Sequence, residues 1–332
     1  MRTLAPPPAS VVDPQLRRPH VGSFAGPLPP VDLGPLAGAM TRLFRRKRWL
    51  YVAVATDAAF VGLAIVDLGY ASNCFAFTWL AGQEGLAVDR SHVGPPGAAR
   101  VGDRAGEGCL ATFTLPRARA RIERGADSRY AVSYRAPGFE LDVRLDSAGA
   151  PPPIAAIADL GDGRVNTTEK RALLVGEGHV RIDGRRVALD GALGGLDYTH
   201  GLLKRRTAWR WAFALGRARS GERVAFNLVE GFVGEPECAL WIDDRLYPLA
   251  EGRFGYDLAA PLRPWTVRTA DGAVDLHFEP GGMHAERKRL GLVASTFLQP
   301  VGRYRGTIAV PGRAPLELDG TPGVAEHQDV LW

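Results

Sequence analysis

Hydrophobic and polar residues alternate over short stretches through most of the chain. Residues 209–215 are typical, because two Trp, one Phe and one Leu share one face of an extended segment and Arg and Ala occupy the other. Residues 178–182 and 186–189 flank Asp183-Gly184, a dipeptide that favours a tight turn between antiparallel strands. The pattern therefore predicts antiparallel strands joined by hairpins.

The same alternation predicts strands in both halves of the chain. In the first half we expect strands at residues 51–56, 60–68, 75–79, 111–115, 118–122, 130–134 and 139–145. In the second half we expect them at residues 178–182, 186–189, 209–215, 224–229, 238–242, 245–249, 266–268, 274–278, 295–298, 304–310 and 316–318. Roughly eight strands per half is typical of sandwiches and barrels, and closure into barrels removes exposed sheet edges. We therefore expect an all-β fold of two antiparallel β-barrels in tandem.

Breaks in the alternation predict how the chain is divided. The first 30 residues contain eight prolines, which favour an extended arm. Apolar residues at helical spacing between Leu33 and Phe44 predict one short N-terminal helix. A run of three prolines at residues 151–153 ends the first set of strands. The expected units are a Pro-rich arm at residues 1–32, a β-barrel-like domain at residues 33–165 and a second one at residues 166–332.

Composition supports the all-β interpretation and removes several other classes. Of 332 residues, 40 are Gly and 25 are Pro, which favours many turns between short strands over long helices. A hydrophobic content of 46% and a charged content of 23% exclude disordered, collagen-like and coiled-coil chains. Residues 50–66 come nearest to a membrane span, but Asp57 interrupts them, so two buried strands around a turn are expected.

The cysteines indicate a reduced compartment. Cys74, Cys109 and Cys238 are far apart and form no CxxC pair. They support neither a disulfide framework nor a zinc site. The N-terminal arm also contains no apolar segment of signal-peptide type, so we expect a cytoplasmic protein.

The formal net charge is +5 at pH 7, and the cations, most of them arginines, are spread along the whole chain. Nucleic-acid-binding proteins concentrate cations on one face, so we expect no nucleic acid partner. One local run, Arg45, Arg46, Lys47 and Arg48, follows the predicted helix. It either complements the negative C-terminal end of that helix or forms a site for a phosphate or the lipid headgroups of a membrane surface.

Residues 194–201 form the densest group of polar and aromatic side chains. Here a carboxyl, a phenol and an imidazole lie between glycines. In an extended segment Asp197 and Thr199 point to one side, and Tyr198 and His200 point to the other. Asp197 and His200 therefore share a space only if the segment curls. In a dry aromatic pocket Asp197 would have a raised pKa and could act as a general acid, with His200 as a second proton-transfer group. The alternative is structural, with Asp197 bonded within a turn and His200 a core imidazole.

Further residues are candidates for lining a ligand site. They are Lys170, Asp67, Tyr70, Asn227, Tyr198, Trp209 and Trp211. The alternative for Lys170 is a surface pair with Glu169, and the alternative for the tryptophans is a place in the core. Glu326-His327-Gln328 is expected to anchor the C-terminal tail.

Cofactor motifs are absent from the sequence. His277 and His284 lie near two glutamates, but the Pro-Gly-Gly between them makes a loop, so no metal site is predicted. There is no GxGxxG segment between a strand and a helix, no Walker loop and no Gly-x-Ser-x-Gly elbow. We therefore expect no cofactor, and no dinucleotide, phosphoryl-transfer or α/β-hydrolase chemistry.

Several motifs resemble the DUF2804 family of uncharacterised bacterial proteins, over essentially the whole chain after the arm. They are Lys47-Arg48-Trp49-x-Tyr51, Asp67-Leu68-Gly69-Tyr70, residues 166–170, Asp197-Tyr198-Thr199-His200-Gly201, Arg206-Thr207-x-Trp209-x-Trp211, and Gly323-x-x-Glu326 with the terminal Trp332. More distantly, the order of Lys170, Gly178, Gly184, Gly194, Asp197, Gly201, Trp209 and Trp211 resembles carotenoid 1,2-hydratase (hydroxyneurosporene synthase) and AttH-like proteins.

The distant resemblance implies two lipocalin-like barrels in tandem, in a superfamily that includes hydratases and cyclases acting on hydrophobic substrates. It places Asp197 on the Asp of the family's Gly-x-x-Asp-x-x-x-Gly segment. His200 departs from that pattern, because an aromatic residue usually precedes the second Gly in the hydratase-like proteins. The resemblance therefore carries the architecture, while the reaction is a separate inference.

Two functions of different class remain open. In the first, a hydrophobic molecule of isoprenoid, polyene or acyl type binds in a barrel or inter-barrel cavity, and Asp197 and His200 transfer protons in a hydratase-, isomerase- or cyclase-like reaction. In the second, the same cavity serves a non-catalytic, lipocalin-like carrier or sequestering protein.

Overall fold

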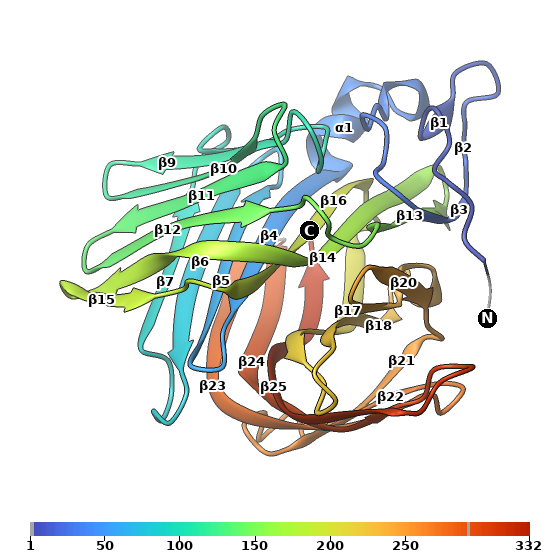
Figure 1. Ribbon diagram of the computed structural model, residues 1–332. Helices are drawn as coiled ribbons and strands as arrows, with labels where there is room; N and C mark the ends of the chain where they lie inside the picture. Colours follow the sequence, from blue (N-terminus) through green and yellow to red (C-terminus); the bar gives the residue numbers. More distant parts are fainter. Residues whose placement is uncertain (1–2, 291–292) are drawn as a thin grey trace.

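The protein folds into two curved antiparallel β-sheets, which the computed structural model describes over residues 3–290 and 293–332 (Figure 1). Before the first long strand lie β1 (Val12–Asp13), β2 (Arg18–Pro19), β3 (Gly22–Ala25), the 3-10 turn η1 (Gly34–Leu36) and the helix α1 (Ala39–Arg45). The predicted short helix is confirmed. The predicted arm is held in place, because β1 pairs with β2 and β3 pairs with β13 of the first sheet.

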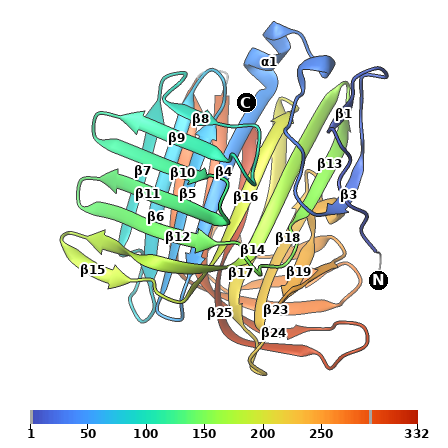
Figure 2. The same ribbon diagram turned by 45° about the horizontal axis from the view of Figure 1, so that its top comes forward.

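The first sheet has the strand order β7-β6-β5-β4-β16-β14-β12-β11-β10-β9-β8, with β13 and β15 paired to β14. Its strands are β4 (Arg46–Ala55), β5 (Ala59–Asp67), β6 (Ser72–Leu80), β7 (Val88–Gly94), β8 (Ala99–Val101), β9 (Leu110–Leu115), β10 (Ala118–Arg124), β11 (Arg129–Ala136), β12 (Phe139–Asp146), β13 (Ile154–Gly161), β14 (Arg164–Ile182), β15 (Arg185–Ala188) and β16 (Ala192–Leu202). Contacts of β8 with β5 curl the sheet into a nearly closed barrel (Figure 2).

The second sheet has the order β20-β19-β18-β17-β25-β24-β23-β22-β21. Its strands are β17 (Arg206–Arg217), β18 (Arg223–Gly231), β19 (Ala239–Ile242), β20 (Arg245–Pro248), β21 (Gly252–Gly255), β22 (Trp265–Thr269), β23 (Val274–Leu290), β24 (Val293–Ile308) and β25 (Leu316–Leu331), with the 3-10 turn η2 (Glu235–Glu237) after β18. This sheet forms a half-barrel. Together with the nearly closed barrel of the first sheet, it confirms the predicted all-β fold of two lipocalin-like β-barrels in tandem.

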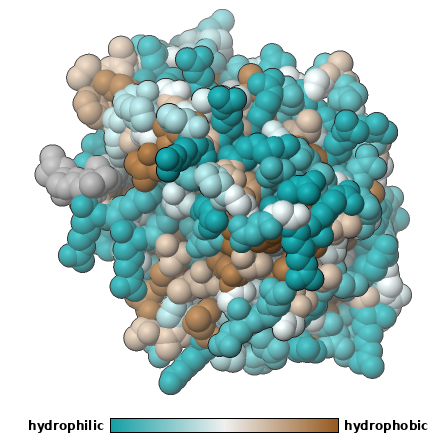
Figure 3. Space-filling model, turned by 90° about the vertical axis from the view of Figure 1, so that its left-hand side faces the viewer, coloured by the Kyte–Doolittle hydropathy of each residue, from teal (hydrophilic) through white to brown (hydrophobic). Residues whose placement is uncertain are grey.

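The two sheets pack against each other through a shared hydrophobic core. One core cluster fills the first barrel, and the other joins β4, β5 and β6 to the second sheet through residues such as Phe77 and Phe213. Gly195 on β16 permits this close approach, since a Cβ there would lie 2.4 Å from Cζ of Phe213. Hydrophilic side chains predominate on the side of the first-sheet hairpin turns (Figure 3).

The change of sheet lies after β16, at residues 203–205. The expected division at residues 165 and 166 does not coincide with it, because β14 continues through that point as one strand of the first sheet. The hydrophobic stretch at residues 50–66 contributes to the hairpin of β4 and β5, as expected. No helix among the described residues is long and apolar enough to cross a membrane.

Candidate functional site

A pocket of about 340 Å³ lies between the two sheets, within the size range of small-molecule sites. Each sheet contributes a row of cross-strand neighbours whose side chains face it. The row from the first sheet is Lys170, Asp197, Tyr51, Ala64 and Phe75, on β14, β16, β4, β5 and β6. The row from the second sheet is Val229, Trp211 and Glu326, on β18, β17 and β25. The pairing registers therefore bring residues from distant parts of the sequence to one cavity.

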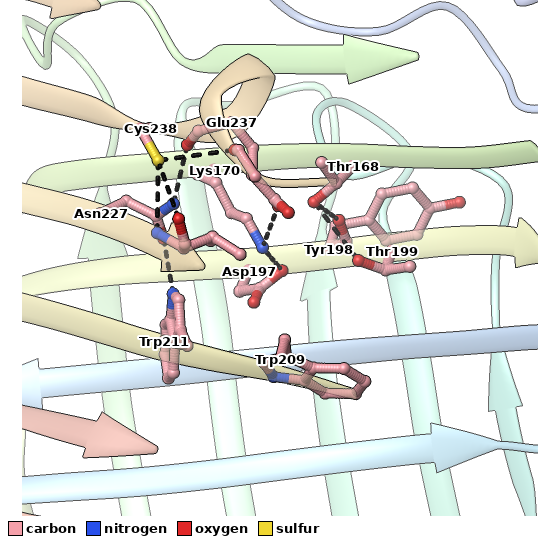
Figure 4. Close-up of polar contacts among 12 residues, drawn as sticks. Thr168, Lys170, Asp197, Tyr198, Thr199, Trp209, Trp211, Asn227, Glu237 and Cys238 are labelled. Atoms are coloured by element: carbon pink, nitrogen blue, oxygen red, sulfur yellow. Dashed lines mark hydrogen bonds and ion pairs between the residues drawn. The ribbon is translucent and has the colours of Figure 1, made fainter. Parts of the chain in front are cut away.

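Lys170, Asp197 and Glu237 form a cluster of charges at one wall of the pocket, in which Lys170 and Glu237 are buried and Asp197 is partly exposed (Figure 4). The Lys170 ammonium lies 2.5 Å from Oδ1 of Asp197 and 3.2 Å from Oε2 of Glu237. Burial opposes the charge of Lys170, but the two carboxylates outweigh it and raise the pKa of that ammonium. Burial also raises the pKa of Glu237, against the effect of Lys170. The arrangement keeps Lys170 charged and holds the Asp197 carboxyl at the pocket.

Glu326 is a further carboxyl group in the pocket, on the sheet opposite that cluster. Its Oε1 accepts a hydrogen bond of 2.7 Å from the Trp209 indole, and its Oε2 accepts one of 2.7 Å from the Gln299 amide. Burial raises the pKa of Glu326 to about 7, and the nearby charge of Asp197 adds to the effect. Near neutral pH this group therefore exists partly as a carboxylic acid that can donate a proton.

Aromatic rings make up much of the remaining wall. Trp49 stacks on Trp209 with ring centroids 5.9 Å apart, and Tyr51 meets Trp211 edge to face at 5.5 Å. These rings make the pocket largely apolar, and the faces of indole rings attract positive charge. The site thus combines an apolar ligand space with four carboxyl groups, those of Asp197, Glu237, Glu286 and Glu326.

The structure does not bring His200 to Asp197. Because β16 stays extended, Asp197 and Thr199 face the pocket, while Tyr198 and His200 face the interior of the first barrel. The Tyr198 hydroxyl donates to the carbonyl of Gly102 at 3.0 Å and lies 3.4 Å from Nδ1 of His200. Burial lowers the pKa of His200 to about 3, which keeps the ring neutral. Neither Tyr198 nor His200 lines the pocket, because the segment does not curl.

The other sequence-predicted residues divide between the pocket and its supports. Tyr70, Trp209 and Trp211 line the pocket together with Lys170. Asn227 lies behind it, where its Oδ1 accepts from the Trp211 indole at 2.7 Å and its Nδ2 donates to the Glu237 carbonyl at 2.8 Å. Asn227 therefore positions two lining residues.

Asp67 does not line the pocket. It forms an ion pair with Arg48 and accepts a hydrogen bond of 2.9 Å from the backbone N–H of Gly69. Its carboxyl group therefore fixes the turn between β5 and β6, and only Tyr70 of the predicted Asp67–Tyr70 pair reaches the pocket wall.

Sequence reasoning missed Glu237, Gln299 and Glu326 as pocket residues. Glu326 was expected to anchor the tail, although it also belongs to the closing motif of the family resemblance. The available signal was the spacing of Glu326 and Gln328. They lie two residues apart on one strand, so their side chains face one side, and both line the pocket. Nothing in the sequence around Glu237 indicates that η2 turns its side chain towards Lys170.

Residues suited to metal binding are not clustered in the described parts of the chain, where no group of three or more His, Cys, Asp or Glu could hold an ion. His284 instead packs on the ring of Phe75 at 4.4 Å and lies 2.7 Å from Asp89. His277 sits on β23, paired with Thr266 and Arg305. The three cysteines are buried and free.

Comparison with known proteins identifies the family and the fold. The model of DUF2804, a domain of unknown function, matches residues 8–332. No curated protein matches the sequence.

Solved structures with a similar fold include a crystal structure of CghA with Sch210972, at a TM-score of 0.55 and 16% identity, covering 86% of this chain and 88% of that one. Kievitone hydratase from Nectria haematococca is similar at a TM-score of 0.52 and 13% identity, covering 100% of this chain and 98% of that one. An AttH-like protein from Nitrosomonas europaea gives a TM-score of 0.50 at 13% identity, covering 86% and 92%. At these identities the likeness shows the fold.

Proposed function

The chain belongs to the DUF2804 family, and we propose that it binds a hydrophobic small molecule in the pocket between the sheets and transfers protons to and from it. The observation that carries this proposal is Glu326, a buried acid with a pKa of about 7 in an aromatic pocket. Structural neighbours include a hydratase and a protein crystallised with a small molecule, which supports a small-molecule site in this fold.

The apolar lining favours a ligand of isoprenoid, polyene or acyl type, because such molecules gain most from leaving water. Trp49 and Trp209 present stacked indoles on one side of the pocket, and Phe75 and Phe297 pack 5.4 Å apart on another. Charged side chains line the pocket in two groups, one around Lys170 and Glu326 and one where the Lys288 ammonium donates to Glu286 at 2.6 Å. A mostly hydrocarbon ligand with its reactive double bond near the first group fits that distribution.

Glu326 is the proton donor in the proposed reaction. Its O–H bond breaks as a C–H bond forms on the double bond of the ligand, which leaves a carbocation and a Glu326 carboxylate. The indole faces of Trp49 and Trp209 stabilise the cation while it exists. Trp209 also donates a hydrogen bond to Glu326 at 2.7 Å, so it holds the acid against the ligand space.

Asp197 is the proton acceptor. Its ion pair with Lys170 requires the carboxylate form, which can take a proton from the carbon next to the cation or from a water molecule adding to it. The first outcome moves the double bond, and the second hydrates it. Proton exchange with solvent then restores the Glu326 acid and the Asp197 carboxylate. His200 takes no part, because it lies on the opposite face of β16.

The test is a comparison of Glu326→Gln and Asp197→Asn with the wild type, using compounds retained from an organic extract of the native host. General acid and base groups contribute about 10²–10⁴-fold, so each variant is expected to lose turnover by that factor while binding the compound within about threefold of the wild type. Glu84→Gln, at an exposed position, is the matched control.

Two results would overturn parts of this proposal. If the wild type and both variants all bind a compound and all release it chemically unchanged, the protein has no catalytic step and is a carrier. Equal loss of binding and of thermal stability in both variants would make the carboxyl groups structural.

A further inference from the structure

The short helix α1 carries an apolar face that no part of the described chain covers. Met40, Leu43 and Phe44 lie at positions i, i+3 and i+4, and they are 67%, 45% and 51% exposed. That spacing places three large hydrophobic side chains on one face of the helix. Figures 1 and 2 both show α1 at the periphery of the molecule, outside the two sheets.

Cations surround this apolar face. Arg42 and Arg45 belong to the last turn of α1, and Arg46 follows directly. None of these three guanidinium groups forms an ion pair with a carboxylate in residues 3–290 or 293–332. Lys204 is exposed, and it follows Leu203, whose backbone N–H donates to the carbonyl of Arg45 at 2.9 Å, so it lies near the end of α1. The surface thus combines apolar side chains with partly exposed guanidinium groups that form no ion pair within the described residues, although the charge of Asp67 acts on Arg46.

Lys47 and Arg48 have other roles in the same run. Lys47 is fully buried, and its ammonium donates to the carbonyls of Phe44 at 2.8 Å and Leu68 at 3.0 Å. It also lies over the rings of Tyr70 at 4.4 Å and Trp332 at 5.7 Å. Leu68, Tyr70 and Trp332 line the pocket, so Lys47 ties the end of α1 to the pocket wall.

We propose that α1 docks the protein on an anionic lipid surface, with Met40, Leu43 and Phe44 entering the interface and Arg42, Arg45, Arg46 and Lys204 contacting the headgroups. An amphipathic helix binds a bilayer surface through buried apolar area together with electrostatic attraction to anionic lipids. The charge around the helix favours this occupant over an apolar face of another protein. The docked helix lies one layer from the pocket wall, which gives a membrane-dissolved ligand a short route inward. That last consequence rests on the proposed function, whereas docking itself does not.

The test measures flotation of the full chain with vesicles of phosphatidylcholine alone and of phosphatidylcholine with phosphatidylglycerol. We expect the wild type to float with the anionic vesicles, and high salt to release it. Each arginine near an anionic surface strengthens binding about fivefold, so Arg42→Gln/Arg45→Gln is expected to weaken partitioning about 25-fold. Met40→Ser/Phe44→Ser is expected to abolish flotation, because it removes most of the apolar face.

Matched controls come from exposed residues elsewhere. Leu258→Ser/Leu262→Ser removes two leucines that are 48% and 54% exposed, and Arg185→Gln/Arg186→Gln removes two exposed cations on β15. Both controls are expected to float like the wild type. All four variants are expected to melt within a few degrees of the wild type, with the largest shift for Arg42→Gln/Arg45→Gln, because the Arg42 guanidinium donates to the carbonyl of Ala37 at 3.0 Å. Failure of the wild type to float, equal binding to neutral vesicles, or equal losses in the controls would overturn the proposal. In the first case the helix face would belong to a protein partner. Because no pocket ligand enters this experiment, its failure leaves the proposed function standing.

Discussion

At the scale of single residues, the proposed chemistry of the pocket depends on whether the Glu326 carboxyl group carries a proton. The Glu326 carboxyl has almost no access to water and receives hydrogen bonds from Trp209 and Gln299. These two bonds favour the carboxylate, yet burial outweighs them and raises the pKa to about 7. The same side chain is therefore both the proposed proton donor and a group that makes folding depend on pH.

The stability of the fold should report the protonation of Glu326. Because its pKa rises from 4.5 in the unfolded chain to about 7 in the folded protein, the stability it contributes is complete below pH 4.5 and is lost as the pH rises through 7. The shift corresponds to about 3 kcal/mol. Relative to wild type, Glu326→Gln should gain about that amount between pH 5 and pH 8, as measured by urea unfolding. A difference between the two proteins that stays constant with pH would contradict the assignment.

Lys170 neutralises the buried carboxylate of Glu237 and the partly buried one of Asp197, and its removal should be costly. Lys170→Met leaves Asp197 and Glu237 without their cation, and breaking a buried ion pair in this way costs about 3–5 kcal/mol. Equilibrium unfolding in urea measures the loss, with the exposed Lys204→Met as control. Adding Asp197→Asn and Glu237→Gln to Lys170→Met should recover much of the stability. No recovery in the triple variant would show that the aliphatic stem of Lys170, and not its charge, is what matters.

At the scale of elements, alternation and turn residues account for most of what the sequence could predict. The hairpin of β14 and β15 turns at Asp183 and Gly184, as predicted from that dipeptide. The alternation along β16 also predicted correctly that Asp197 and Thr199 face one side and Tyr198 and His200 the other. Both predictions depend only on the local geometry of a turn or a strand, and the order of residues is enough to predict that geometry.

The length of β14 could not be predicted in the same way. It pairs with β13, β12, β15 and β16 along its 19 residues, and a bulge between Arg171 and Leu174 divides it. Leu173 takes a φ of 60° there, although leucine has no local preference for that conformation. The strands paired on either side of β14 impose this conformation. Pairing with distant strands also sets the length of β14, and for this reason the expected boundary at residue 166 falls inside a continuous strand.

Gly195 on β16 sets how closely the two sheets approach beside the pocket. A Cβ at this position would lie 2.4 Å from Cζ of Phe213 and 2.9 Å from the carbonyl oxygen of Arg171. Gly195→Ala should therefore destabilise the protein by about 1–3 kcal/mol through overpacking. Gly125→Ala is the control, since its Cβ would meet only Asp127 Oδ1 at 3.9 Å. Equal melting temperatures for the two variants would show that the sheets can separate at no cost.

At the scale of the whole molecule, the pocket exists because two sheets face each other. Asp197 and Glu326 are far apart in sequence. Each is a polar residue on a strand, and the alternation of neither strand marks it as part of a site. The sequence indicated Asp197 through its cluster with Tyr198 and His200, and it gave no local reason to join Glu326 to that cluster. The register of β25 against β17 supplies the reason, because it aligns Glu326 with Trp211. Long-range pairing of this kind is what sequence reasoning could not reach.

The most direct test of the central claim is whether the inter-sheet pocket retains an apolar molecule. The variant Ala64→Phe places an aromatic ring into the pocket, because Ala64 on β5 lines it. Purified wild type and Ala64→Phe would each be incubated with a total organic extract of the native host and re-isolated. Mass spectrometry of the bound compounds should find an apolar species, of isoprenoid, polyene or acyl type, enriched on the wild type and absent from Ala64→Phe. Equal retention by both proteins, or no enrichment on the wild type, would contradict the account.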